Sequence, residues 1–165
     1  MPTGPAARTT DPVLHPLPPV LTVGPGSMNV LIGFLPAWRG CPLGASAGLM
    51  AGNQAAQVAI KAAEATTAAA VGPAIPGAYA AEQALKTTQL ASMSASVMSA
   101  AGGADIHTCA TPLPVPPHGP GVVVDGSATV STNFLPQSRM GDTVIEAVGP
   151  PNKVAKGEMT VIVGG

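Results

Sequence analysis

Hydrophobic residues recur in short runs towards both ends of the chain, and this spacing predicts short β-strands. The runs lie between turns rich in glycine and proline, which is the pattern of strands joined by tight turns. We therefore expect a mainly β fold, with a last hairpin that pairs residues 144–148 with residues 159–163. The other strands are expected near residues 20–23, 28–32, 121–124 and 128–132.

The middle of the chain has a different pattern. Residues 41–103 are rich in alanine and contain two helix-like runs, at about 45–71 and 78–101, with glycine and proline between them at 72–77. Because glycine and proline break helices, the segment predicts an inserted α-helical hairpin. Its charged residues argue against a membrane span and favour a hairpin that lies on a neighbouring surface. These residues are Lys61, Glu64, Glu82 and Lys86.

An internal repeat relates the two ends of the chain. The pattern Gly-Ser-x-x-Val-x-x-x-Phe-Leu-Pro-x-x-Arg begins at Gly26 and again at Gly126, one hundred residues later. A third copy is divided between the termini, with its turn and strand at residues 157–165 and its Pro-x-x-Arg turn at residues 5–8. If the C-terminal strand pairs beside the N-terminal turn, the fold gains a pseudo-threefold arrangement.

The three arginines of the chain occupy the same position in the three repeats. We expect each to bond carbonyl groups or a nearby acid, and so to have a structural role. The arginines are Arg8, Arg39 and Arg139, and the candidate acids are Asp11, Asp105 and Asp142.

Composition narrows the class of protein. Of 165 residues, 2% are aromatic and 9% are charged, so a core without aromatic bulk needs another means of stabilisation. The net charge of −1 gives no basic field for nucleic acid. Two cysteines are too few for a disulfide framework, and the N-terminus lacks the pattern of a secretory signal. A thiolate ligand in a protein made in the reducing cytosol is consistent with these features.

A metal site is predicted from the few residues that can bind one. His107, Cys109 and His118 lie within twelve residues, and alternate residues of an extended segment point to the same face. Zinc prefers imidazole and thiolate ligands, and a structural site is normally closed by four of them. The remaining histidine is His15, so elimination gives a site of His15, His107, Cys109 and His118, with Cys41 left over.

A plainer interpretation is that each histidine is solvated or hydrogen-bonded, because a His-x-Cys pair alone is a weak signal. The position of all three histidines beside proline-rich turns favours structural zinc. A catalytic zinc keeps one coordination position open for water, whereas four candidates fill this shell. We therefore expect no enzymatic activity.

The repeat and the ligand pattern resemble those of the PAAR-repeat proteins. The motif is literal at Pro5-Ala6-Ala7-Arg8 and degenerate at residues 36–39 and 136–139. The resemblance covers residues 1–40 and 104–165, and residues 41–103 lie outside it. The sequence departs from the family where its usual Asn-Gly becomes Gly33-Phe34 and Asn133-Phe134. It also departs where the second alanine of the motif becomes Trp38 and Ser138.

The resemblance implies a conical fold of three β-hairpin units, formed by residues 1–40 and 104–165 around the inserted hairpin. It implies one structural zinc on three histidines and a cysteine, which carries over to His15, His107, Cys109 and His118. It further implies a spike tip that caps the trimeric valine-glycine-repeat (VgrG) spike of a type VI secretion system. Such a tip sharpens the spike for membrane puncture and helps effector delivery.

A protein of this kind is cytoplasmic before firing and is then secreted into the target cell or the medium, with transient membrane contact. The alternative is an adaptor that acts through residues 41–103. The hairpin would then insert into a membrane, or recruit an effector or a chaperone.

Overall fold

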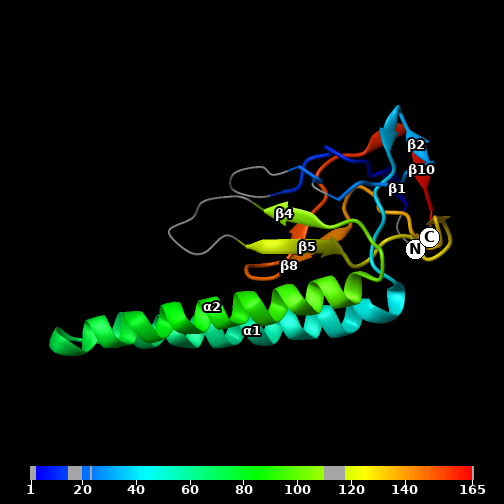
Figure 1. Ribbon diagram of the computed structural model, residues 1–165. Helices are drawn as coiled ribbons and strands as arrows, with labels where there is room; N and C mark the ends of the chain where they lie inside the picture. The colour runs from blue at the N-terminus through cyan, green and yellow to red at the C-terminus, as the bar shows by residue number, and fades with distance from the viewer. Residues whose placement is uncertain (1–2, 15–19, 23, 110–117, 165) are drawn as a thin grey trace.

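The computed structural model describes residues 3–14, 20–22, 24–109 and 118–164. These residues form two α-helices and ten short strands in small sheets (Figure 1). The helices are α1 (Leu43–Ala69) and α2 (Ile75–Ala101), with a 3-10 turn, η1 (Gly72–Ala74), between them. The strands are β1 (Gly4–Ala6), β2 (Leu31–Ile32), β3 (Leu35–Pro36), β4 (His107–Cys109), β5 (Gly119–Val123), β6 (Ser131–Thr132), β7 (Leu135–Pro136), β8 (Thr143–Glu146), β9 (Asn152–Lys153) and β10 (Glu158–Val163).

The strands pair antiparallel. One sheet has the order β4-β5-β8-β9, and three pairs join β1 with β10, β2 with β3, and β6 with β7. The pairing of β10 with β1 confirms that the C-terminal strand lies beside the N-terminal turn. The predicted hairpin between residues 144–148 and 159–163 is wrong, because β8 pairs with β5 and β9. All residues of β8 are buried, which suits a central strand, whereas most residues of β10 are exposed.

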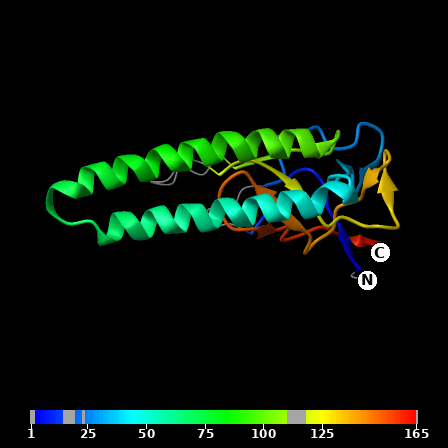
Figure 2. The same ribbon diagram turned by 90° about the horizontal axis from the view of Figure 1, so that it is seen from below.

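The alanine-rich segment is a helical hairpin. Figures 1 and 2 show α1 and α2 side by side and extending well beyond the strands. Residues 75–77, predicted to lie in the break, belong to the first turn of α2, where proline is tolerated because its missing N–H has no partner there. Within the described part of the chain, neither helix combines the length and the apolarity that a membrane span requires.

The hairpin packs on one face of the four-stranded sheet. Leu49 of α1 and Val97 of α2 share a buried cluster with Val122, Val124 and Ile145. Neighbouring residues of a strand point to opposite faces, so Val123 and Val144 pack on the other side, around Trp38. The sheet is therefore covered on both faces.

Three arginine–aspartate pairs, which we call the clamps, repeat one geometry. They are Arg8–Asp11, Arg39–Asp105 and Arg139–Asp142. In each clamp the arginine backbone N–H donates to the aspartate Oδ2 at 2.8 Å. The guanidinium group also contacts Oδ1 of the same aspartate, at 3.1, 2.7 and 3.1 Å. The contacts expected of the three arginines are confirmed. The helical hairpin separates Arg39 from Asp105 in the sequence, yet the two residues are in contact. Without residues 42–104 they would stand three residues apart, as the other two pairs do.

The three turns that carry the clamps are joined in a closed ring. The N–H of Ala7 donates to the carbonyl of Ser138 at 2.8 Å, that of Ser138 to Trp38 at 3.0 Å, and that of Trp38 to Ala7 at 3.0 Å. All three residues are completely buried. Since they occupy the same position in the three Pro-x-x-Arg motifs, each repeat bonds to the next and the third bonds back to the first.

A second set of contacts follows the same cyclic order further out. Each joins the start of one repeat to the hairpin end of another. Two are hydrogen bonds, of Ser27 with Asn133 at 2.5 Å and of Ser127 with the carbonyl of Gly164 at 2.5 Å. At the third place Gly33 lies so near Glu158 that a Cβ on Gly33 would collide with the glutamate side chain. The repeats therefore pair with one another through equivalent positions at two levels.

Deleting residues 42–104 tests the division into a β part and an inserted hairpin. The deletion joins Cys41 to Asp105 and gives the Arg39–Asp105 clamp the spacing of the other two. We expect a folded β protein whose unfolding free energy is lower by a few kcal/mol. The reason is that Val122, Val124 and Ile145 each lose part of the roughly 1.5–3 kcal/mol that full burial of such a side chain contributes. Circular dichroism and urea denaturation measure both properties.

The control for this deletion is the same shortened protein with Asp105→Asn. This change weakens the Arg39–Asp105 clamp, so the variant should unfold at a lower urea concentration. An unfolded product from the simple deletion would show that the helical hairpin is integral to the fold.

Candidate metal centre

The candidate metal centre lies on the four-stranded sheet, where glycines leave room for larger side chains. His107 on β4 and Glu146 on β8 both lie opposite Gly121 of the central strand β5. A Cβ atom at Gly121 would lie 2.9 Å from Cγ of Glu146, too close for any real side chain. The two side chains can therefore meet across β5 only because position 121 is glycine.

The other two side chains come from the ends of β4 and β5. Cys109 ends β4 opposite Gly119, and His118 immediately precedes β5. Gly149 has a φ of +104°, and a Cβ there would lie 2.9 Å from Cε1 of His118. Glycine at 149 thus permits both the turn after β8 and the close approach of the imidazole.

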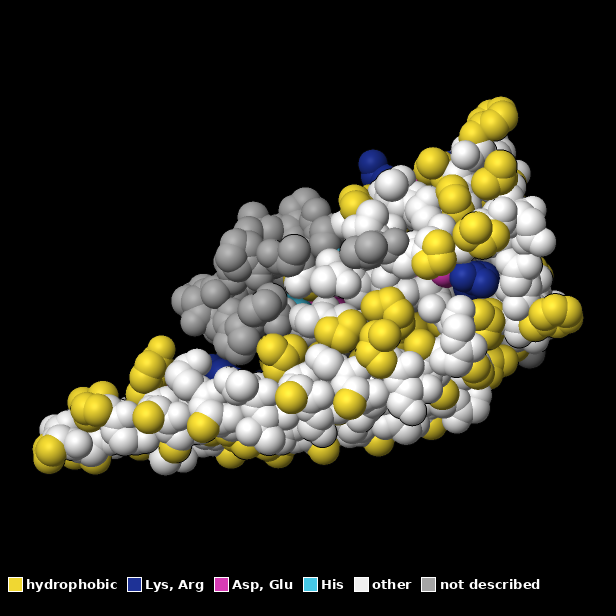
Figure 3. All heavy atoms as spheres, viewed as in Figure 1, with side chains coloured by type: hydrophobic (Ala, Val, Ile, Leu, Met, Phe, Trp, Pro, Cys, Tyr) yellow, Lys and Arg dark blue, Asp and Glu magenta, His cyan; other side chains and the backbone are white. Residues whose placement is uncertain are grey.

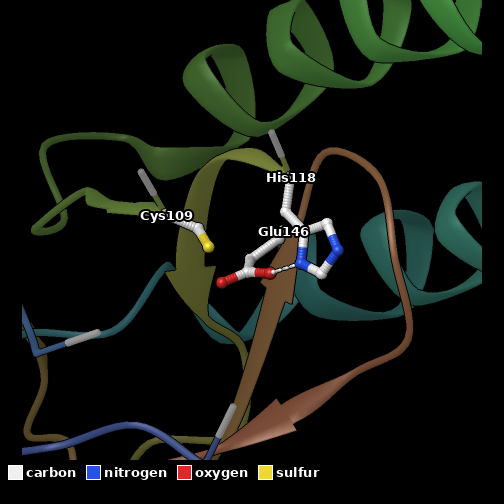
Figure 4. A group of neighbouring side chains, drawn as sticks. All are labelled: Cys109, His118 and Glu146. Atoms are coloured by element: carbon white, nitrogen blue, oxygen red, sulfur yellow. Dashed lines mark hydrogen bonds and ion pairs between the residues drawn. The ribbon is translucent and has the colours of Figure 1, made fainter. Parts of the chain in front are cut away.

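Cys109, His118 and Glu146 form a compact group, the candidate metal group. One ligand atom from each lies within 4.8 Å of the others, and Figure 4 shows the thiol and the imidazole directed at the carboxylate. Zinc bonds of about 2.0–2.3 Å place the ligand atoms of one ion about 3–4 Å apart. Cys109 and Glu146 are 1% and 0% exposed, and the His118 side chain is 11% exposed. The group can hold a metal ion after small side-chain adjustments.

Glu146 is at the centre of the polar contacts. Its Oε2 accepts hydrogen bonds from Nδ1 of His118 at 2.8 Å and from Nδ2 of Asn152 at 3.1 Å. Its Oε1 lies 3.2 Å from Nε2 of His107. Burial raises the pKa of this carboxyl, but the hydrogen bonds with His107 and His118 outweigh it, and the net pKa is lowered. The carboxylate is completely buried and is held by His107, His118 and Asn152, as a buried polar group requires.

His107 is held on its other side by the main chain. Its Nδ1 lies 3.0 Å from the carbonyl oxygen of Val20. A carbonyl only accepts, so Nδ1 carries the proton and donates it. The ring is completely buried and lies beside the candidate metal group without being part of it.

The structure thus brings together two of the four predicted ligands, Cys109 and His118, and places His107 against Glu146. His15 lies outside the described residues. Sequence reasoning missed Glu146, although a signal was present, because Glu146 stands four residues after Asp142 as Cys109 stands four residues after Asp105.

Cys41, the cysteine left over by the sequence prediction, belongs to the apolar core. It is completely buried with Leu49 and Val97 of the helices. Burial raises the pKa of its thiol to about 11, so it stays protonated at neutral pH. It is therefore the natural control for Cys109.

Neither a protein-family model nor a curated protein matches this sequence. What the candidate metal group can do is therefore argued from its own residues.

Removing a ligand of the candidate metal group should both release metal and destabilise the protein. A structural zinc contributes on the order of 10 kcal/mol to folding. If Cys109→Ser or His118→Ala loses about half of this, the melting temperature falls by roughly 10–20 °C for a chain of this length. Metal analysis should find one ion per wild-type chain and less in the variants, and calorimetry gives the melting temperature.

Cys41→Ala should keep the full metal content, since that thiol is remote from the group. Unchanged stability of the wild-type protein after chelation would contradict a structural metal.

Proposed function

We propose that this protein is a spike tip of the PAAR-repeat kind. It caps a trimeric VgrG-type spike of a type VI secretion system, and the three repeats form a pseudo-threefold cone. One structural zinc fastens the cone. The protein acts as a structural element in puncture and effector delivery and has no catalytic role. It is cytoplasmic before firing and is secreted with the spike. The closed ring of turns and the candidate metal group support this proposal.

The observation that carries the proposal is a pair of strained, exposed aromatic residues. Phe34 and Phe134 occupy equivalent positions in two-residue hairpin turns and have φ values of +67° and +65°. This left-handed conformation costs a residue with a side chain roughly 1–2 kcal/mol. The two rings are 95% and 100% exposed, so burial within the chain does not offset that cost. Such residues mark a binding surface.

Other apolar side chains extend this surface, which we call the hairpin-end surface. Figure 3 shows hydrophobic side chains gathered at the end of the molecule where β2 and β10 lie. The exposed members besides the two phenylalanines are Met28, Leu31, Met159 and Ile162. Strand β4, which ends at Cys109, runs away from β2 and β10 (Figure 1). A metal-fastened point and an apolar base would then face in different directions.

The symmetry of the ring favours a partner with threefold symmetry. The hairpin turns at Gly33-Phe34 and Asn133-Phe134 hold equivalent places in units that contact one another cyclically. A trimer offers three identical sites around one axis, so equivalent hairpin ends can enter equivalent sites. The blunt end of a trimeric spike provides such a surface.

A second candidate is an adaptor that recruits an effector through the helical hairpin. The part of the hairpin farthest from the sheet has no charged residue between Glu64 and Glu82. Val71 and Tyr79 there are 78% and 53% exposed. Both functions are compatible in one protein, because the hairpin-end surface and the tip of the helical hairpin are separate.

Replacing the exposed phenylalanines tests docking on the spike. Glycine adopts positive φ without strain, so Phe34→Gly with Phe134→Gly should keep or slightly raise the melting temperature. The double variant should lose most co-purification with the cognate trimeric spike, because it removes both apolar anchors. Pull-down of the full chain with the spike measures this.

The matched control is Val71→Ser with Tyr79→Ser, which removes exposed apolar side chains from the helical hairpin. This control should bind the spike as the wild type does. Full spike binding by the phenylalanine variant would refute docking through the hairpin-end surface.

A further inference from the structure

The carboxylate of Glu146 has a place in the candidate metal centre that the sequence pattern did not assign. We propose that Glu146 is a direct metal ligand beside Cys109 and His118, and that His107 positions the carboxylate instead of binding the ion. The inference rests on the metal site proposed above and does not depend on docking to a spike.

Geometry separates the roles of His107 and Glu146. Residues two positions apart in a strand are separated by about 6.6 Å, so the backbone of His107 lies that far from the backbone of Cys109. Its ring is anchored by the bond from Nδ1 to the carbonyl of Val20, and its Nε2 faces Oε1 of Glu146 at 3.2 Å. Glu146 lies opposite the same glycine as His107, and its side chain brings an oxygen into the candidate metal group, whereas the His107 ring is held towards Val20.

The repeat provides an independent argument. Cys109 and Glu146 each follow the aspartate of a clamp by four residues, after Asp105 and Asp142. Their strands, β4 and β8, flank β5 from its two sides. Equivalent positions of two units thus deliver a thiol and a carboxylate to one place. In the sequence, His15 stands at the same interval after its own clamp aspartate.

Charge balance favours a carboxylate in contact with the ion. One thiolate and one carboxylate neutralise a divalent cation, which lowers the cost of placing that cation in a buried site. Cysteine, histidine and glutamate are all ordinary zinc ligands. His118 borders a hollow of about 170 Å³ that Gln57, Lys61 and Gly149 also line, and this hollow gives an ion a path to the group.

His107 then acts on the metal indirectly, as a residue that hydrogen-bonds to a metal ligand and orients it. Its Nε2 contacts Oε1, and Nδ2 of Asn152 donates to Oε2, so both carboxylate oxygens are oriented. Outer partners of this kind typically change metal affinity by about 10–100-fold without entering the coordination shell. The two roles predict different spectra.

Cobalt substitution distinguishes them. We would load the full-length wild type, Glu146→Gln and His107→Gln with Co²⁺ and record visible and near-ultraviolet absorption. Glu146→Gln should shift the visible d–d bands while keeping the thiolate-to-cobalt band of Cys109. His107→Gln should keep the d–d bands of the wild type and weaken affinity by about 10–100-fold. Glu158→Gln, the same change away from the group, should alter neither property.

An unchanged d–d spectrum in Glu146→Gln, or a shifted one in His107→Gln, would overturn the assignment. Because a variant of a buried residue can fail to fold, the wild type loaded with ¹¹³Cd provides a second test by NMR. Coupling between cadmium and a ring nitrogen is expected for His118, and its detection for His107 would also overturn the assignment. Spike co-purification, measured on the same samples, reports separately on the proposed function.

Discussion

The backbone ring formed by Ala7, Trp38 and Ser138 is the contact on which the β part depends. Each repeat contributes a strand pair of only a few residues, too small to fold alone, and the ring joins these pairs around one centre. Trp38 fills the middle beside alanine and serine, so a chain with 2% aromatic residues uses its one indole where three units meet. The clamps hold each turn in place, since the arginine main chain and side chain both bond to one aspartate.

Two places in the molecule are locally unfavourable in free energy, and the folding of the chain alone does not explain them. Glu146 places a carboxyl group in a completely buried position, and the two hairpin phenylalanines combine a left-handed backbone with nearly full exposure. Under the proposals made above, a metal ion would offset the first cost and a bound spike would offset the second. Structures tolerate such costs mainly at functional sites, because the surrounding contacts over-determine the conformation. Here the closed ring and the covered sheet supply those contacts.

The sequence predicted the helical hairpin and the repeat, because each leaves a local pattern or a long exact match. For the C-terminal strand it predicted the wrong partner, residues 144–148, and gave the place beside the N-terminal turn only as a condition. It did not predict the partners of β8, since alternation shows that a strand is buried but not which strands flank it. Glu146 was missed for a related reason. Elimination among histidines and cysteines closed a shell of four, and a glutamate in a strand is ordinarily solvent-facing. The spacing of four residues after Asp142 is a weak signal by itself, and the contacts with His107, His118 and Asn152 are what place Glu146 in the candidate metal centre.

The place of the insertion follows from the clamps. The helical hairpin leaves the β part after Cys41 and returns before Asp105, and the N–H of Asp105 donates to the carbonyl of Arg39 at 3.1 Å, as in the two uninterrupted clamps. The two ends of the helical hairpin are therefore adjacent, and its insertion leaves every hydrogen bond of the ring in place. In return the helices cover Val122 and Ile145, which would otherwise expose an apolar face of the sheet. The helical hairpin enters and leaves the β part at one point and covers the sheet that carries the candidate metal group. Its far end can therefore vary in sequence without disturbing the ring or that group.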